Sequence, residues 1–133
     1  MVIKQLIMSK ALKIYIAGPY TAETEEQRLI NVQAAIDISF ILFNRGHFPY
    51  VPHLTHYIDL RANAIGHQLT WEDYMKWDTP WLKACDALFY LSSSRGVDIE
   101  LQVAKELGKQ IFYSLDDVPN VILKHYISNL VQE

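Results

Sequence analysis

The chain has 133 residues, 50% of them hydrophobic and 20% charged, a composition typical of one globular domain and not of a disordered chain. A net charge of −3 without any cluster of lysines or arginines argues against a nucleic acid polymer as partner, and the single cysteine, Cys85, argues against a disulfide framework. No segment approaches the ~20 apolar residues of a membrane span, so we expect one cytoplasmic domain over residues 1–133 that binds no membrane.

The first predicted element is a strand at residues 12–17, which read Leu-Lys-Ile-Tyr-Ile-Ala. It ends at Gly18 and Pro19, where glycine allows a close backbone approach and proline prevents further pairing. The loop continues through Tyr20 and Thr21. Because the carboxyl ends of parallel strands border the crevice in which ligands bind, we expect this loop to face that crevice.

A long helix is predicted next, from about residue 24 to Asn44, with acidic residues in its first turn. Residues 48–52 should then form a short strand with a proline at or near each end, which is typical of the edge of a sheet. The apolar residues of the helix that recur at helical spacing, and that we expect to face the core, are Leu29, Val32, Ile36, Phe40 and Phe43.

Residues 53–69 are predicted to be a long loop. A loop of this length in a small domain usually forms a lid, a wall of a binding site or an assembly surface. It contains His53, His56 and Asp59, whose spacing a metal could use. Because no convincing fourth ligand accompanies them, we predict no metal site.

A broken helix is predicted after this loop. Thr70 is the expected N-cap of a helix at residues 71–77, with Asp73 in the reciprocal position of a capping box. Pro80 should end or kink that helix, because a proline inside a helix lacks the N–H group that the helix needs. Asp78 or the next residue would then cap a second short helix, with Pro80 in its first turn.

The second half of the chain predicts a strand, a helix and a second strand. Residues 87–91 form a continuous apolar run, typical of a strand buried on both faces. Residues 97–107 have a helical pattern that Gly108 should end, and residues 111–113 form another short apolar run. A last helix is expected to begin near Asp116. Its inner face should carry Val121, Ile122, His125, Tyr126 and Leu130.

Strands and helices therefore alternate along the chain, which predicts an α/β fold. We expect a single-domain flavodoxin-like or Rossmann-like architecture, with a parallel sheet of four or five strands and helices on both faces. The glycine loop after the first strand is neither the dinucleotide-binding fingerprint nor the Walker sequence. Conventional NAD binding and P-loop hydrolysis are therefore disfavoured, and no cofactor is predicted.

Glu100 is the most unusual residue of the helix at 97–107. On a helical wheel it falls beside Leu101 and Ala104, on the side that should face the core. It also lies near the start of its helix, where unpaired N–H groups carry a charge of about +0.5. We therefore expect an ionised Glu100 that points into the crevice. The alternative is a glutamate that only hydrogen-bonds the start of its own helix or a neighbouring hydroxyl.

Asp78 is a second carboxylate with two possible roles. Beside Pro80 it could be a helix cap and nothing more. If it also lies at the crevice, Asp78 and Glu100 form the pair that a glycosidic-bond enzyme requires, in which one carboxylate attacks the anomeric carbon and the other manages the proton of the leaving group. Ser94 and Arg95 could bind a phosphate or a sugar oxygen at the helix start, or could be ordinary turn and surface residues.

Three segments of the chain resemble the nucleoside 2-deoxyribosyltransferase-like superfamily, which includes the deoxynucleoside 5′-monophosphate N-glycosidases. Residues 15–20, Tyr-Ile-Ala-Gly-Pro-Tyr, are similar to the family's opening strand and substrate loop. Asp78, followed by Trp81, lies in a segment that is similar to the family's aspartate-containing helix. Residues 94–100, Ser-Arg-Gly-Val-Asp-Ile-Glu, are similar to the segment that carries the catalytic glutamate, and this match is the most specific.

The resemblance implies a site in which Glu100 attacks the anomeric carbon, Asp78 handles protons and orients the sugar, and Tyr15 orients Glu100. It also implies that Ser94 contacts the phosphate of a nucleotide, and that the protein assembles as a homo-oligomer in which one subunit completes the pocket of another. The substrate-binding residues predicted in this way are Gly18, Pro19, Tyr20, Thr21, Ser94, Arg95 and Gly96.

The leading prediction is therefore an enzyme that cleaves or transfers the N-glycosidic bond of a small-molecule nucleoside or nucleoside 5′-monophosphate. The alternative from another class is a binding protein, in which the same crevice holds a nucleotide or an ADP-ribose-like ligand as a sensor without turnover. A third possibility is a structural subunit whose crevice is vestigial. Release of free base distinguishes the enzyme from both alternatives.

Overall fold

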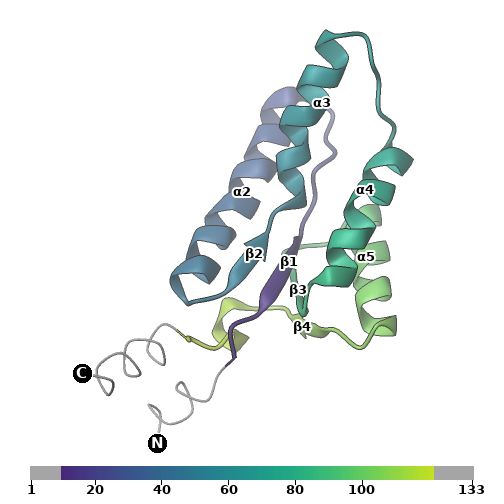
Figure 1. Ribbon diagram of the computed structural model, residues 1–133. Coiled ribbons are helices and arrows are strands. Elements are labelled where there is room, and N and C mark those ends of the chain that lie inside the picture. Colours follow the sequence, from purple (N-terminus) through teal and green to yellow (C-terminus); the bar gives the residue numbers. More distant parts are fainter. Residues whose placement is uncertain (1–9, 122–133) are drawn as a thin grey trace, which may run out of the picture.

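The computed structural model describes residues 10–121, which contain a four-stranded parallel sheet with the strand order β2-β1-β3-β4 (Figure 1). The strands are β1 (Lys13–Ala17), β2 (Phe48–Tyr50), β3 (Ala87–Tyr90) and β4 (Gln110–Phe112). The α-helices are α2 (Glu25–Asn44), α3 (Thr55–Ala64), α4 (Trp71–Ala84) and α5 (Arg95–Glu106). The α/β, Rossmann-like class is confirmed, and β2 lies at an edge as expected.

Helices cover both faces of the sheet because strand side chains alternate between two apolar clusters. On one face Ile16 of β1 packs in a cluster with Leu42 of α2. On the other face Tyr15 of β1 packs in a cluster with Leu82 of α4 and Ala104 of α5. Figure 1 shows α2 on one side of the sheet and α4 and α5 on the other.

The strand order determines where a ligand can bind. β1 pairs with β2 on one side and with β3 on the other. The connection that follows β1 packs on one face of the sheet, whereas the helix that follows β3 packs on the other. In open parallel sheets, connections that diverge in this way leave a crevice beyond the carboxyl ends of the two strands. We therefore expect a binding site next to Gly18, after β1, and Ser94, after β3.

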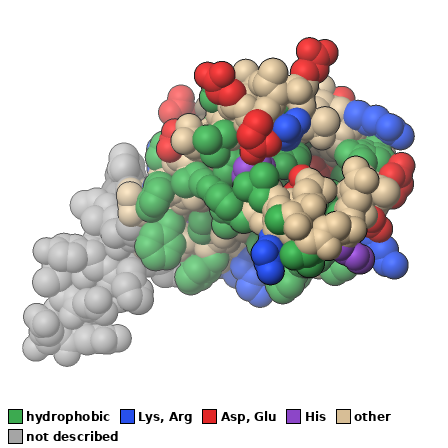
Figure 2. Space-filling model, turned by 90° about the horizontal axis from the view of Figure 1, so that it is seen from above, with side chains coloured by type: hydrophobic (Ala, Val, Ile, Leu, Met, Phe, Trp, Pro, Cys, Tyr) green, Lys and Arg blue, Asp and Glu red, His purple; other side chains and the backbone are tan. Residues whose placement is uncertain are grey.

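The core-facing side of α2 differs from the predicted side. Phe40 and Phe43 are 63% and 61% exposed, and Leu29 is also exposed. Of the predicted residues Val32 is buried as expected, and the other buried residues of the helix are Ala35 and Leu42. The helix carries two neighbouring apolar stripes, and the stripe with the small Ala35 is the one that packs on the sheet. Seen from above, hydrophobic side chains gather at the surface on the α2 side of the molecule (Figure 2).

Residues 53–69, predicted to be a loop, are mostly helical. A 3-10 helix at Pro52–Leu54 leads directly into α3. The sequence pattern does not predict α3, because a helix is recognised by a stripe of large buried apolar residues. This helix instead buries a histidine, His56, and the small Ala62. Its large apolar side chains are exposed, among them Tyr57, Ile58 and Leu60.

α4 is one continuous helix, so the break predicted at Pro80 is wrong. The capping box at its start is confirmed, with Thr70 and Asp73 exchanging hydrogen bonds. A proline inside a helix costs about 3 kcal/mol. The helix continues because Leu82, after the proline, packs in the apolar cluster with Tyr15 and Ala104, so packing outweighs the local preference.

α5 begins at Arg95, earlier than predicted, because Ser94 acts as its N-cap. The Ser94 hydroxyl accepts a hydrogen bond from the Val97 N–H group at 3.2 Å. Gly108 follows the helix with a φ of 70°, as expected of the glycine that ends it. The first turn of α5 therefore starts directly at the crevice, and Glu100 lies one turn inside the helix.

The last predicted helix does not begin where the sequence suggests. Leu115–Asp117 form a 3-10 helix, and residues 118–121 are not helical. The remaining positions of its predicted inner face, residues 122–130, lie outside the described part of the chain. Within residues 10–121, no helix combines the length and the hydropathy that a membrane crossing requires.

Candidate functional site

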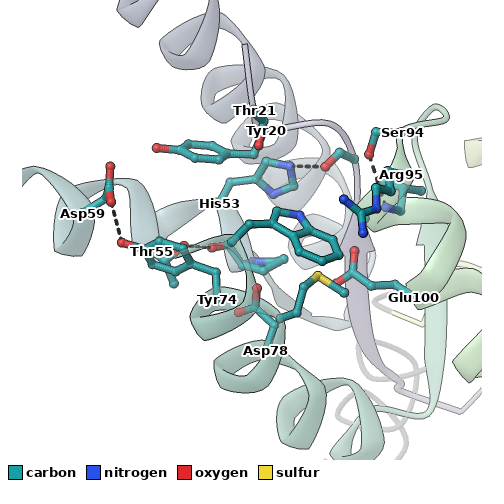
Figure 3. A pocket seen from close by; sticks show the side chains of 16 residues that line it. Tyr20, Thr21, His53, Thr55, Asp59, Tyr74, Asp78, Ser94, Arg95 and Glu100 are labelled. Atoms are coloured by element: carbon teal, nitrogen blue, oxygen red, sulfur yellow. Dashed lines mark hydrogen bonds between the residues drawn. The ribbon is translucent and has the colours of Figure 1, made fainter. Parts of the chain in front are cut away.

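A cavity of about 520 Å³ lies at the carboxyl ends of β1 and β3 (Figure 3). Its walls come from the loop after β1, the residues that follow β2, one side of α4 and the first turns of α5. Small-molecule sites commonly have volumes of about 300–1,000 Å³. The cavity therefore has the size of a ligand site and occupies the crevice that the strand order creates.

Most of the predicted site residues meet at this cavity. Glu100 and Asp78 both line it, and Tyr15 lies behind it and donates a hydrogen bond to Glu100. Pro19 is the exception, because it does not line the cavity although its neighbours do. The predicted substrate-binding residues that line it are Gly18, Tyr20, Thr21, Ser94, Arg95 and Gly96.

Glu100 points from α5 into the cavity (Figure 3). Burial raises the pKa of Glu100 from 4.5 to about 7, the hydrogen bond from Tyr15 acts in the opposite direction, and the nearby Asp78 carboxyl raises the pKa further. The helix start therefore does not keep the pKa of Glu100 low, as the sequence suggested. Burial outweighs the favourable helix start, and the carboxyl can exchange a proton near neutral pH.

Tyr15 holds the Glu100 carboxyl in place. Its side chain is completely buried, and burial together with Glu100 and Asp78 raises the pKa of Tyr15 well above its ordinary value. The phenol therefore stays protonated and donates to Glu100. The Tyr15 ring stacks on Tyr50 with 5.6 Å between centroids, and Tyr50 stacks on Trp81 at 5.4 Å. This stack restricts the phenol, and so the carboxyl, to one orientation.

One stripe of α4 faces the cavity. Trp71, Tyr74, Met75 and Asp78 all line it, and residues at this spacing share one face of a helix. Asp78 is only 9% exposed, and its Oδ1 has no hydrogen-bond partner among residues 10–121. Burial raises the pKa of Asp78 from 3.8 to about 7. Asp78 therefore lines the cavity with a carboxyl group whose Oδ1 is buried and unpaired among the described residues.

The two carboxyl groups share a cavity but differ in their surroundings. Glu100 receives a hydrogen bond from Tyr15, which favours its ionised form. Oδ1 of Asp78 receives none from the described part of the chain, so Asp78 keeps a proton more readily. Near pH 7 the pair can hold one proton between its two members. The arrangement can thus supply a nucleophilic carboxylate and a proton donor at the same time.

The start of α5 forms a positively charged end of the cavity, on the side of Glu100 (Figure 3). Free N–H groups of the first helical turn and the Arg95 side chain lie there, next to the capping hydroxyl of Ser94. The Arg95 guanidinium carbon lies 4.3 Å from the ring centroid of Trp71, a cation–π contact that holds the side chain at the cavity. This end of the cavity suits an anionic group.

Tyr20 lines the cavity and is fixed by a buried histidine. The Tyr20 hydroxyl lies 2.8 Å from Nδ1 of His56, and Nε2 of His56 lies 3.1 Å from a Glu25 carboxylate oxygen. His56 is therefore occupied in joining the loop after β1 to the starts of α2 and α3. Within residues 10–121, no three His, Cys, Asp or Glu side chains are grouped so that they could hold a metal ion.

His53 also lines the cavity, although sequence reasoning gave it only a weak metal-binding role. Burial lowers the pKa of His53, so the imidazole is neutral. Its Nε2 lies 2.8 Å from the carbonyl oxygen of Gly18 and must donate to it. Nδ1 then carries a lone pair, and it has no partner among the described residues.

Asp59, Trp71 and Tyr74 also line the cavity and were not predicted to be site residues. The Tyr74 hydroxyl donates to Oδ1 of Asp59 at 2.6 Å, which joins α4 to α3. The helical spacing of Trp71, Tyr74 and Asp78 could have revealed the two aromatic residues. No local signal could have revealed the position of Asp59, because it reaches the cavity on a helix that the sequence pattern conceals.

Gly18 is a point of close backbone approach. A Cβ atom there would lie 2.9 Å from Cδ2 and 3.1 Å from Cβ of Leu91. We expect Gly18→Ala to lower the free energy of unfolding by about 1–3 kcal/mol, as overpacking does. The matched control is Gly96→Ala, since the nearest atom to its Cβ would be Nε1 of Trp71 at 3.7 Å. Urea denaturation should separate the two variants, and equal stabilities would contradict the close approach.

Comparison with known proteins gives a family. The model of the family described as Domain of unknown function (DUF4406) matches residues 12–113, from the residue before β1 to the residue after β4. No curated protein matches the chain. The matched range includes the loop after β1, Asp78 and Glu100, so it covers the whole cavity.

Proposed function

The chain belongs to the DUF4406 family, and we propose that it cleaves or transfers the N-glycosidic bond of a nucleoside or nucleoside 5′-monophosphate. Glu100 is the nucleophile, Asp78 is the proton donor, and Tyr15 orients Glu100. One observation carries the proposal: two carboxyl groups with raised pKa line one cavity, and within residues 10–121 Glu100 has a hydrogen-bond donor whereas Oδ1 of Asp78 has none.

The reaction has two steps. In the first, an oxygen of the Glu100 carboxylate attacks C1′ of the sugar, and the bond between C1′ and the base nitrogen breaks while the base takes the proton of Asp78. The anionic Glu100 also stabilises the positive charge that develops on the sugar ring. In the second, water or an acceptor base attacks C1′, the ester bond to Glu100 breaks, and Asp78 takes the proton. Two displacements at C1′ retain its configuration.

The rest of the cavity supports a nucleotide as the substrate. Trp71 and Tyr74 offer aromatic surfaces on which a base can pack. The start of α5, with Ser94 and Arg95, offers N–H groups and a positive charge to a 5′-phosphate. Because the phosphate end and the aromatic residues lie around the two carboxyls, a sugar between phosphate and base would meet the reacting groups.

The test is release of free base from a panel of ribonucleosides, deoxyribonucleosides and their 5′-monophosphates, followed by chromatography. We expect base release from at least one of them, with monophosphates reacting faster than the corresponding nucleosides. Saturable binding with the ligand recovered intact would instead identify a nucleotide sensor. Neither binding nor release across the panel would contradict both functions.

A further inference from the structure

We propose that Asp59 selects nucleotides whose base carries an exocyclic amino group, by accepting a hydrogen bond from that group at the end of the cavity opposite Glu100. The inference rests on the proposed function for the position of the sugar at Glu100. It does not rest on turnover, because a nucleotide that is bound without reaction would be selected in the same way.

The surroundings of Asp59 leave it a free acceptor. Its Oδ1 accepts the hydroxyl of Tyr74 at 2.6 Å, whereas the partner of Oδ2 among residues 10–121 is the Asn63 amide at 3.5 Å, the outer limit of a hydrogen bond. Burial and the Asp59 carboxylate both raise the pKa of Tyr74, so the phenol remains a donor and fixes the carboxylate. Asp59 lines the cavity, and its second oxygen can therefore accept from a ligand.

The charges of the cavity indicate which part of a nucleotide meets Asp59. Figure 3 shows Asp59 at one end of the cavity and Glu100, Ser94 and Arg95 at the other. A phosphate is attracted to Arg95 and the start of α5 and is repelled by the carboxylate of Asp59. A nucleotide with its phosphate at α5 and its sugar at Glu100 directs its base toward Asp59.

His53, at the start of the segment that carries Asp59, has a second acceptor atom, but that atom is buried. His53 is only 3% exposed and lines the cavity just before α3, and its Nδ1 has no partner among the described residues. Since Nε2 donates to Gly18, Nδ1 can only accept. Asp59, as an acceptor in the cavity wall, favours a base edge that offers an N–H donor there and disfavours one that offers a carbonyl oxygen.

Two matched pairs of nucleotides test the inference. Deoxycytidine and deoxyuridine monophosphates differ in one amino or oxo group and in the proton on the adjacent ring nitrogen, and so do deoxyadenosine and deoxyinosine monophosphates. Phosphate and sugar contacts cancel within each pair. In the Glu100→Gln background, which blocks turnover, we expect calorimetric Kd values at least about 10-fold lower for the amino member of each pair.

Two substitutions in that background assign the preference to Asp59. Asp59→Asn offers an N–H donor where the carboxylate offers only acceptors, so the Kd ratio within each pair should fall to about one or invert. Asp59→Leu, which offers neither, should also remove the preference. Tyr74→Phe removes the hydroxyl but keeps the carboxylate, so it should keep the preference. A merely structural role for Asp59 predicts equal weakening of both members, with the ratio unchanged, and that result would overturn the inference.

Failure of this inference can be told apart from failure of the proposed function. Equal Kd values within both pairs in the parent would overturn the selection by Asp59 and leave base release by the wild-type protein unaffected. Conversely, a clear amino preference in binding, with no base released from any nucleotide by the wild-type protein, would overturn the proposed reaction and support the selection.

Discussion

Replacing Glu100 by glutamine should lower the rate of base release by about 10⁴-fold or more. The amide has the shape of the carboxyl group and can still accept the hydrogen bond from Tyr15, so the site should keep its geometry. It cannot form the ester bond to C1′, and it places no negative charge beneath the developing cation. Nucleotide binding should change much less than the rate, because the substitution removes a reacting group and keeps the contact surface.

The measurement is the single-turnover rate of base release, with the Kd of the same nucleotide determined in parallel. Glu106→Gln is the matched control, because it makes the same chemical change on an exposed side chain of the same helix, outside the cavity. We expect its rate to equal that of the wild-type protein. Base release at the wild-type rate by Glu100→Gln would show that another group attacks C1′ or that no covalent step occurs.

The order of the four strands and of α2, α4 and α5 could be predicted because their signals are local, whereas α3 was missed. The capping box of Thr70 and Asp73 starts α4, and Gly108 ends α5, as their residue types require. The predictions that failed depend on what surrounds an element. Whether Pro80 interrupts α4, and whether Phe40 or Ala35 faces the core, is decided by neighbours that are distant in the sequence.

In the candidate site, too, residues with local sequence signals could be predicted and residues placed by distant neighbours could not. Gly18, Ser94 and Glu100 could be predicted to lie together because they follow strands whose carboxyl ends meet at one edge of a parallel sheet. Asp59 and His53 could not, because they reach the cavity through the helical segment after β2, which the sequence pattern suggests is a loop. The protonation of Glu100 also could not be predicted. Burial raises its pKa more than the helix start lowers it, and the extent of burial is known only from the structure.

We expect the stability of Asp78→Asn, measured against that of the wild-type protein, to be higher in alkaline than in acidic solution. We also expect the variant to release base more slowly. In the folded chain burial raises the pKa of Asp78 from 3.8 to about 7, so the folded state holds a proton that the unfolded chain releases between these values. This contribution to stability is present below about pH 4 and is lost as the pH rises through 7. Asparagine cannot ionise, so the stability of the variant does not fall with pH for this reason.

The free energy of unfolding of Asp78→Asn minus that of the wild-type protein should therefore increase by about 2–3 kcal/mol between pH 5 and pH 8. Urea denaturation at both values measures it, and the packing effects of the amide cancel because they do not change with pH. Asp37→Asn, on the exposed side of α2, controls for the loss of one negative charge. The rate of base release should fall by about 10²–10⁴-fold, since the leaving base loses its proton donor. A stability difference that is the same at both pH values would mean that Asp78 is ionised without cost in the fold, and a proton donor at neutral pH would then have to be sought elsewhere in the cavity.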